Sequence, residues 1–249
     1  MSTDTPMSTP PVSSAQHPLK TFKYYDLFLG AYVCVLLCAN LIGPAKFSTV
    51  HLPLLGDVTF IAGVLFFPIS YFFGDVLTEV YGYARDRRCV WAGFGALAFA
   101  SLMAAVIVHL PPSADYRGGP QQAVEMIFGS TWRIVSASIV AFWCGSLVNS
   151  FVLAKMKIYT RGRWLWSRAI GSTLCGEAVD TGLFMSIAFL GTLPLSSLLP
   201  TMLTQYLMKV GWEVVATPLT YRLVGFLKRA EQEDYYDYQT NFTPFSIRT

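Results

Sequence analysis

The chain has 249 residues, of which 53% are hydrophobic and 13% charged, and its mean hydropathy is +0.46. Soluble domains carry roughly 25% charged residues, so this composition excludes an ordinary soluble protein and predicts an integral membrane protein. The net charge of +3 is too small to indicate a nucleic-acid-binding surface. We therefore expect a lipid bilayer, and no nucleic acid, around this chain.

The cysteine and histidine patterns give no sign of a metal site or a cofactor. The five cysteines form no CxxC motif, and the three histidines fall in the N-terminal tail or near expected loops. Walker, nucleophile-elbow and HExxH sequences are absent. We expect no metal, no cofactor and no enzymatic activity. A membrane enzyme that uses paired acids is a weaker alternative, because no nucleophile accompanies them.

Residues 1–22 are rich in Ser, Thr and Pro, which predicts a disordered tail. They lack the charged start, short apolar core and small-residue cleavage site of a signal peptide. Residues 23–230 are expected to form a transmembrane domain, because they contain six apolar segments near the ~20 residues that cross a bilayer. The fold class is thus an all-α membrane protein, followed by a cytoplasmic tail at 231–249. The six segments are 25–43, 58–80, 89–110, 131–154, 168–191 and 198–226.

Two links between these segments have their own character. Residues 44–57 contain two prolines and a loosely alternating stretch, which predicts a short extended link or hairpin. Residues 111–130 are rich in Pro and Gly and predict a loop, with one amphipathic turn at 121–128.

Lysine and arginine gather in alternate links, and such residues mark the cytoplasmic side of short loops. The links on the other side carry only Lys46 and Arg117. This asymmetry predicts an even number of crossings with both termini in the cytoplasm. The cytoplasmic set is Lys20, Lys23, Arg85, Arg87, Arg88, Lys155, Lys157, Arg161, Arg163, Arg168, Lys228 and Arg229.

Small residues recur at four-residue spacing in two segments, and such spacing lets helix backbones approach closely. They serve either packing within the chain or a face for a homo-oligomer, and both readings stay open. The residues are Ala96, Ala100 and Ala104 in the third segment and Ala141 and Gly145 in the fourth.

The second segment admits two acids, Asp75 and Glu79, one helical turn apart in an apolar run. A carboxylate at membrane depth is costly unless it faces a protein interior or a wet cavity. These acids therefore mark a candidate functional site.

The last two segments repeat this pattern. Glu177 and Asp180 share one helix face, and Lys209 and Glu213 lie on one stripe with Trp212 beside it. Lys209 can pair with Glu213 along its own helix or neutralise the two acids across the interface.

Three further polar residues complete the candidate set. Asn40 and Asn149 lie in the first and fourth segments, whereas Arg133 points away from Asn149 and is assigned to gating or charge pairing. Buried polar pairs that only fix helix register are the alternative reading. The expected substrate-binding residues are Asn40, Asp75, Glu79, Asn149, Glu177, Asp180, Lys209, Trp212 and Glu213.

A cavity lined by carboxylates, amides and aromatic rings suits a small planar heterocycle. Carboxylates accept hydrogen bonds from ring N–H and amine groups, amides pair with a carbonyl edge, and aromatic faces stack on rings. Tyr71, Phe142 and Trp212 are candidates for stacking.

Three blocks together resemble the bacterial queuosine precursor transporter family, also called the vitamin uptake transporter (VUT) family. The blocks are Phe67-Pro68-Ile69-Ser70-Tyr71 through Asp75-Val76-Leu77-Thr78-Glu79-Val80-Tyr81-Gly82, then Asp180-Thr181-Gly182-Leu183-Phe184-Met185-Ser186, then Lys209-Val210-Gly211-Trp212-Glu213-Val214 with Thr217-Pro218-Leu219-Thr220.

The resemblance implies a multi-pass uptake protein of the bacterial cytoplasmic membrane whose six-helix bundle resembles vitamin-importer S components. The implied substrate is 7-cyano-7-deazaguanine, its aminomethyl relative, or both. The alternative is an S-component-like subunit that binds substrate and depends on an ATP-driven module. Many family members have an amide where this chain has Glu177, which leaves the preferred substrate open.

Overall fold

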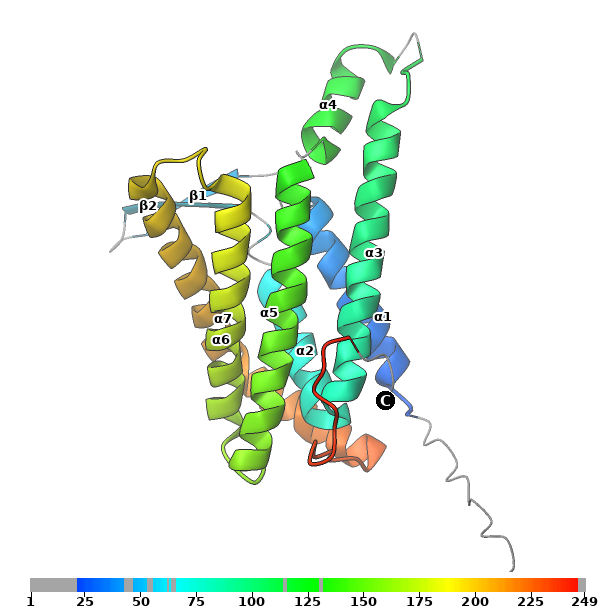
Figure 1. Cartoon of the computed structure of the whole chain (residues 1–249), viewed down its shortest axis with the longest axis vertical. Helices are drawn as coiled ribbons and strands as arrows, with labels where there is room; N and C mark the ends of the chain where they lie inside the picture. Colours follow the sequence, from blue (N-terminus) through cyan, green and yellow to red (C-terminus); the bar gives the residue numbers. More distant parts are fainter. Residues whose placement is uncertain are drawn as a thin grey trace, which may run out of the picture.

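The computed structural model describes residues 22–42, 47–52, 56–61, 63, 66–113, 116–129 and 132–245. The expected disordered tail therefore lies almost entirely outside the described residues. The described chain is mainly a bundle of helices (Figure 1). Its elements are α1 (Tyr25–Leu37), the π-helical turn η1 (Cys38–Ile42), β1 (Phe47–Leu52), β2 (Gly56–Ile61), α2 (Phe67–Tyr81), α3 (Tyr83–His109), α4 (Gly119–Phe128), α5 (Trp132–Tyr159), α6 (Leu165–Phe189) and α7 (Leu195–Glu231).

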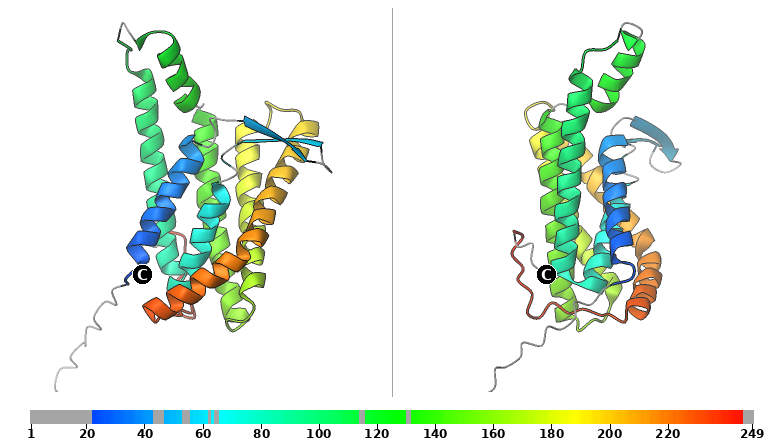
Figure 2. Two further views of the ribbon diagram at one scale, coloured as in Figure 1. Left: turned by 180° about the vertical axis from the view of Figure 1, so that it is seen from behind. Right: turned by 90° about the vertical axis from the view of Figure 1, so that its right-hand side faces the viewer.

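The six apolar helices α1, α2, α3, α5, α6 and α7 lie side by side (Figures 1 and 2). Helix α5 packs between α3 and α6, and α7 crosses the bundle at a tilt to contact both α6 and α2. The helical bundle expected from the sequence is thus present. The short helix α4 lies beside the far end of α3, where the sequence predicted one amphipathic turn.

The second segment was predicted to be helical from residue 58, and its start is wrong. Residues 56–61 form β2, which pairs antiparallel with β1 so that Val58 lies opposite Val50. Helix α2 begins only at Phe67, with a proline in its first turn. Proline is tolerated there because the first N–H groups of a helix have no partner within the helix. The sequence predicted an extended link or a hairpin at 44–57. The structure has the antiparallel pair of a hairpin, and it extends to Ile61.

The basic loop expected between the second and third segments is absent from the structure. Gly82 alone joins α2 to α3, and its φ of +88° and ψ of 164° suit glycine. The arginines at 85, 87 and 88 therefore lie in the first turns of α3.

The first and last helices meet at one end of the bundle. The backbone N–H groups of Lys23 and Tyr24 donate to the Glu231 carboxylate at 2.9 and 2.7 Å, which satisfies unpaired donors at the start of α1. The α2–α3 joint and the α5–α6 turn lie at this same end (Figure 2). We call it the basic end, because the lysines and arginines of these joints gather there.

Residues 232–245, expected to be a tail, pack along the basic end, and we call them the C-terminal strap. The backbone N–H of Tyr83 donates to Asp237 at 3.1 Å, and Arg87 donates to the carbonyls of Asn241 and Thr243 at 2.6 and 2.7 Å. The Phe242 ring packs against Tyr83. These contacts join the strap to the helical domain, which was expected from the sequence to end at residue 230.

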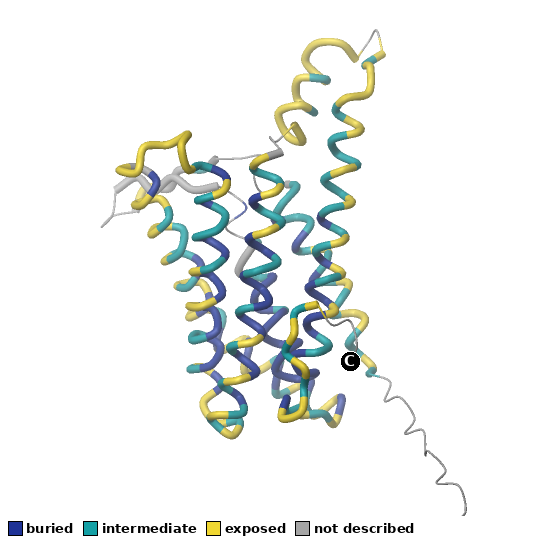
Figure 3. Tube along the Cα trace, in the orientation of Figure 1, coloured by how far each residue is buried: buried dark blue, intermediate teal, exposed yellow. Residues whose placement is uncertain are grey.

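Exposed residues follow the outer faces of the helices (Figure 3), and many of them are large and apolar. Phe99, Leu102 and Val106 on α3 and Leu199 and Leu203 on α7 are all exposed, as expected for side chains that face lipid. Within the described residues, α3 is long and apolar enough to cross a bilayer by length and composition, and so is the stretch from Gly119 to Tyr159 that contains α4 and α5.

Candidate functional site

A buried ion triad joins α6 to α7. Lys209 Nζ lies 2.8 Å from the carboxylate of Glu177 and 2.5 Å from that of Asp180. All three side chains are buried. Of the two pairings that the sequence leaves open for Lys209, the structure has the one with these acids across the interface, and this pairing offsets the cost of burying each charge.

A second pair of acids lies between α2 and α7. Asp75 Oδ1 accepts a hydrogen bond of 2.6 Å from Asn149 Nδ2, and Glu213 is close enough to act electrostatically on Asp75. Asp75 Oδ2 and both carboxylate oxygens of Glu213 are buried and have no hydrogen-bond partner among the described residues. Three acceptor oxygens are therefore available to donors from a bound molecule, since buried polar atoms are normally paired.

Tyr71 on α2 lies between these two groups. A Cβ added to Gly145 would lie 2.7 Å from the Tyr71 hydroxyl and 2.7 Å from Asp180 Cβ. A Cβ added to Gly176 would similarly lie 2.7 Å from Asn149 Cβ. Glycine thus lets α5 and α6 approach closely enough to bring both polar groups together.

We call this assembly the central cluster. Its members come from α2, α5, α6 and α7, four of the six apolar helices. They are Tyr71, Asp75, Asn149, Glu177, Asp180, Lys209 and Glu213.

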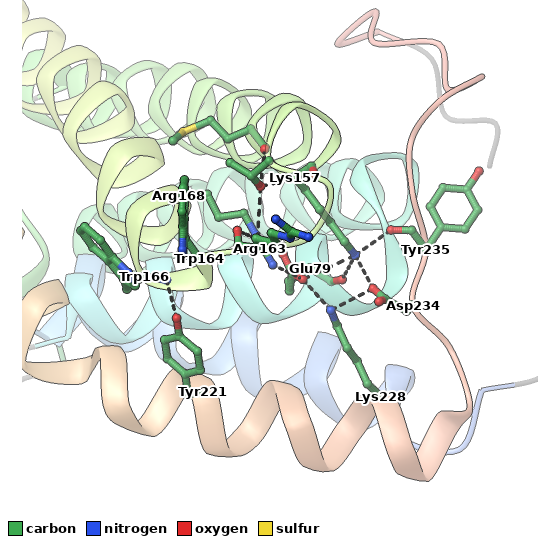
Figure 4. Close-up of polar contacts among 12 residues, drawn as sticks. Glu79, Lys157, Arg163, Trp164, Trp166, Arg168, Tyr221, Lys228, Asp234 and Tyr235 are labelled. Atoms are coloured by element: carbon green, nitrogen blue, oxygen red, sulfur yellow. Dashed lines mark hydrogen bonds and ion pairs between the residues drawn. The ribbon is translucent and has the colours of Figure 1, made fainter.

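Glu79, expected in the same site, belongs to a separate cluster at the basic end (Figure 4). Arg168 donates to its two carboxylate oxygens at 2.8 and 2.7 Å, and Lys228 donates at 2.6 Å. Lys157 Nζ lies 3.5 Å from the carboxylate and donates to the Glu79 carbonyl at 2.6 Å. We call these residues, with Asp234 of the strap, the basic-end ion cluster.

Asp234 extends this cluster onto the strap. It lies 2.6 Å from Lys157 and 2.8 Å from Lys228. Burial raises the pKa of Asp234, but hydrogen bonds from the two lysines outweigh this effect and hold that pKa below its ordinary value.

Three other expected site residues lie away from the central cluster. Trp212 is 44% exposed, and Asn40 bonds the carbonyl of Leu36 and the hydroxyl of Ser138. Arg133 donates to the carbonyls of Ile187 and Leu190 at 2.5 Å each. Arg133 thereby satisfies the unpaired carbonyls at the end of α6, where positive charge is also favoured by the helix dipole.

Sequence reasoning missed Asp86, Lys157 and Arg168 as buried residues, because they stand in basic stretches that mark topology. All three are at most 1% exposed. Glu79 was the signal from which these cations could have been found. A buried acid needs a cation, and the basic links supply most of the cations of the chain.

A void of about 10 Å³ lies at the edge of the central cluster and touches Tyr71 and Asn149, which is room for about one water molecule. The other residues that line it belong to α1, α2, α3 and α5. The chamber that the sequence predicts for a planar heterocycle stays a prediction.

The comparisons with known proteins now bear on this geometry. A family model described as “Putative vitamin uptake transporter” matches residues 61–223. The chain belongs to this family. The match includes every residue of the central cluster, and it confirms the resemblance drawn from the three sequence blocks.

A “Probable queuosine precursor transporter” of Bacillus subtilis (strain 168) is 32% identical over 187 residues, which cover 74% of this chain and 78% of that relative. No solved structure matches the chain. The family is one of transporters rather than enzymes, so this family member is a membrane transporter for a small molecule.

Proposed function

We propose that this protein imports a queuosine precursor, 7-cyano-7-deazaguanine or its aminomethyl relative, across the bacterial cytoplasmic membrane. The family membership and the printed name of the Bacillus subtilis relative support the substrate class. The central cluster is the proposed binding site.

The observation that carries this proposal is the set of unpartnered acceptors on Asp75 and Glu213. The guanine-like edge of a deazaguanine offers a ring N–H next to an exocyclic amine, and a carboxylate can accept from two such donors at once. Glu213 has both oxygens available, and Asp75 has one. Glu213 therefore takes the guanine-like edge, with Asp75 beside it.

Asp180 has a different role in this scheme. Its carboxylate is held by Lys209 together with Glu177, so its charge is already balanced by the lysine. The triad holds α7 against α6 and keeps the two faces of the site in register.

Entry of the substrate requires α2, α5, α6 and α7 to separate around the central cluster. Helix α7 contains Pro200 and Pro218, and each proline removes a helical hydrogen bond, which favours bending at that point. Bending of α7 would move Lys209 and Glu213 together relative to α2 and α6. We propose that this movement opens the site.

The test is uptake in a bacterial strain that lacks both precursor synthesis and its own importer, read out as queuosine-modified tRNA. Glu213→Gln keeps the shape of the side chain but replaces one acceptor oxygen by a donor. We expect uptake to fall at least tenfold, which corresponds to about 1.4 kcal/mol.

Glu125→Gln on the exposed face of α4 is the matched control and should leave uptake unchanged. The amount of each variant in the membrane is measured alongside. Normal uptake by Glu213→Gln at equal protein amounts would remove Glu213 from the site.

Purified protein in liposomes addresses the mode of transport. A transporter that works alone accumulates or equilibrates the precursor inside the vesicles. A subunit that depends on an ATP-driven module binds the precursor without moving it, and that result would contradict the proposal.

A further inference from the structure

The void at the edge of the central cluster has an unusually polar lining. It lies among α1, α2, α3 and α5 and is bounded on one side by Gly74. Seven of the residues that line it carry a side-chain oxygen. They are Tyr32, Ser70, Tyr71, Asp86, Ser146, Asn149 and Ser150.

Three of these oxygens are buried and lack a hydrogen-bond partner among the described residues. They are Asp86 Oδ1, Asn149 Oδ1 and Tyr71 Oη, on residues that are 0%, 2% and 4% exposed. Unpartnered buried oxygens around a space of about 10 Å³ indicate a small guest.

The orientation of the Asn149 amide supports this inference. Its Nδ2 must face Asp75 Oδ1, at 2.6 Å, because a carboxylate only accepts when ionised. Its Oδ1 is consequently directed away from Asp75, and Asn149 is one of the residues that line the void. This oxygen attracts a positive charge.

The negative charge of Asp86 also favours a positive charge nearby. The Ser150 hydroxyl donates to Asp86 Oδ2, and the Thr78 hydroxyl lies near enough to act on the same carboxylate. The charged side chains that act on Asp86 include two other acids, Asp237 and Asp75. An ionised, fully buried carboxylate is very costly unless a cation balances it.

We propose that the void binds one small monovalent cation of the size of Na⁺. Carboxylate, hydroxyl and amide oxygens are the ligands that hard cations prefer. A single carboxylate in the lining balances a single positive charge, whereas a divalent ion would leave an excess charge buried. The site holds α2, α3 and α5 together through Tyr71, Asp86 and Asn149.

The role that we give to this cation in transport rests on the proposed function. Asn149 touches both sites, because its amide nitrogen binds Asp75 and the residue also lines the void. A cation on its Oδ1 would fix the amide and, through it, the Asp75 carboxylate that faces the substrate. The cation is thus the proposed coupling ion for precursor uptake.

The experiment measures the thermal unfolding temperature of the purified protein in detergent, without any precursor. NaCl is varied and the ionic strength is held constant with choline chloride; KCl serves as the larger cation. A ligand that binds only the folded state stabilises by mass action. We expect the unfolding temperature to rise by several degrees with NaCl and less with KCl.

Two variants make the test specific. Asp86→Asn removes the charge, and Gly74→Ala adds a methyl group whose nearest neighbour would be Asp86 Oδ1 at 3.9 Å, in ordinary van der Waals contact. Gly74→Ala should therefore fold while it fills the void, and both variants should lose the NaCl-dependent rise. Glu125→Gln should keep it.

The outcomes separate this proposal from the proposed function. If the unfolding temperature of the wild type does not change with NaCl, the cation site is overturned, even if liposomes take up the precursor. A NaCl-dependent rise that survives in both variants also overturns it. A rise lost in both variants supports the site, even if no precursor is transported, and in that case the proposed substrate alone would be wrong.

Discussion

At the scale of single residues, Asp75 and Glu79 show how surroundings decide the role of a buried acid. The two lie one turn apart on α2 and are equally buried. Glu79 is surrounded by Arg168, Lys157 and Lys228, whereas Asp75 has one amide donor and one unpartnered oxygen. Glu79 is thus a structural ion-pair partner, and Asp75 is available to a ligand.

This difference predicts distinct effects of neutralising Glu79. Glu79→Gln leaves three cations around a neutral amide, and breaking a buried ion pair in this way costs about 3–5 kcal/mol. We expect a clear fall in the unfolding temperature in detergent, with unchanged precursor affinity in the protein that remains folded. A variant of normal stability and lost affinity would return Glu79 to the substrate site. Glu125→Gln again provides the control for loss of an acid.

Several site residues were predictable from spacing alone. The stripes Glu177–Asp180 and Lys209–Glu213 had to face the interior, and the structure brings all four into the central cluster. Trp212 was misplaced, because adjacent helical residues differ by about 100° around the axis and Trp212 therefore faces outward. A cationic partner for Glu79 was predictable, but its identity was not, since Lys157, Arg168 and Lys228 come from three different helices whose positions relative to α2 are set by the fold.

At the scale of elements, Gly82 is the tightest joint in the bundle. It turns the chain from α2 into α3 within one residue, in a conformation that is essentially restricted to glycine. A Cβ at this position would also lie 2.3 Å from the Tyr235 ring. Joint and strap therefore pack directly against each other.

A double-mutant cycle can separate the two effects at Gly82. Gly82→Ala combines backbone strain of about 1–3 kcal/mol with the clash against Tyr235. Gly82→Ala with Tyr235→Ala keeps the strain and removes the clash. We expect the unfolding temperature of the double variant to exceed that expected from adding the two single effects. Strict additivity would mean that the strap does not pack on the joint.

The ends of elements were the least predictable part of the fold. Residues 58–80 form one apolar run, and only pairing with β1 distinguishes 58–61 as a strand. The strap reads as a polar tail, yet its aromatic residues Tyr235, Tyr236 and Phe242 were a signal that part of it would be buried. Tyr236, for example, lies so close to the α5–α6 turn that a Cβ on Gly162 would lie 2.2 Å from its hydroxyl.

At the scale of the whole molecule, buried charge occurs in two layers. The central cluster is built by buried side chains of α2, α5, α6 and α7. The basic-end ion cluster lies where the strap approaches the ends of the helices (Figure 4). The buried side chains are concentrated toward the basic end, and exposure increases toward α4 (Figure 3). The bundle is therefore most firmly packed at the end that carries most of its positive charge.

This distribution predicts the orientation in the membrane. Within the described residues, the end near α4 carries Arg117 and Arg133, whereas the basic end carries the arginines of α3, the lysines and arginines around the α5–α6 turn, and Lys228 and Arg229. An excess of lysine and arginine stays on the cytoplasmic side. We therefore expect the basic end, and with it the start of α1 and the strap, in the cytoplasm.

Cysteine labelling can test this orientation without altering any charge. After replacement of the five native cysteines, one variant carries Gln122→Cys on α4 and another Tyr159→Cys at the end of α5; both positions are exposed. A membrane-impermeant maleimide should label the first in intact cells, and the second only after the cells are permeabilised. Labelling in the reverse pattern would invert the topology. Labelling of both in intact cells would place α4 and the last residue of α5 on one side of the membrane, which contradicts a single crossing by α5 between them.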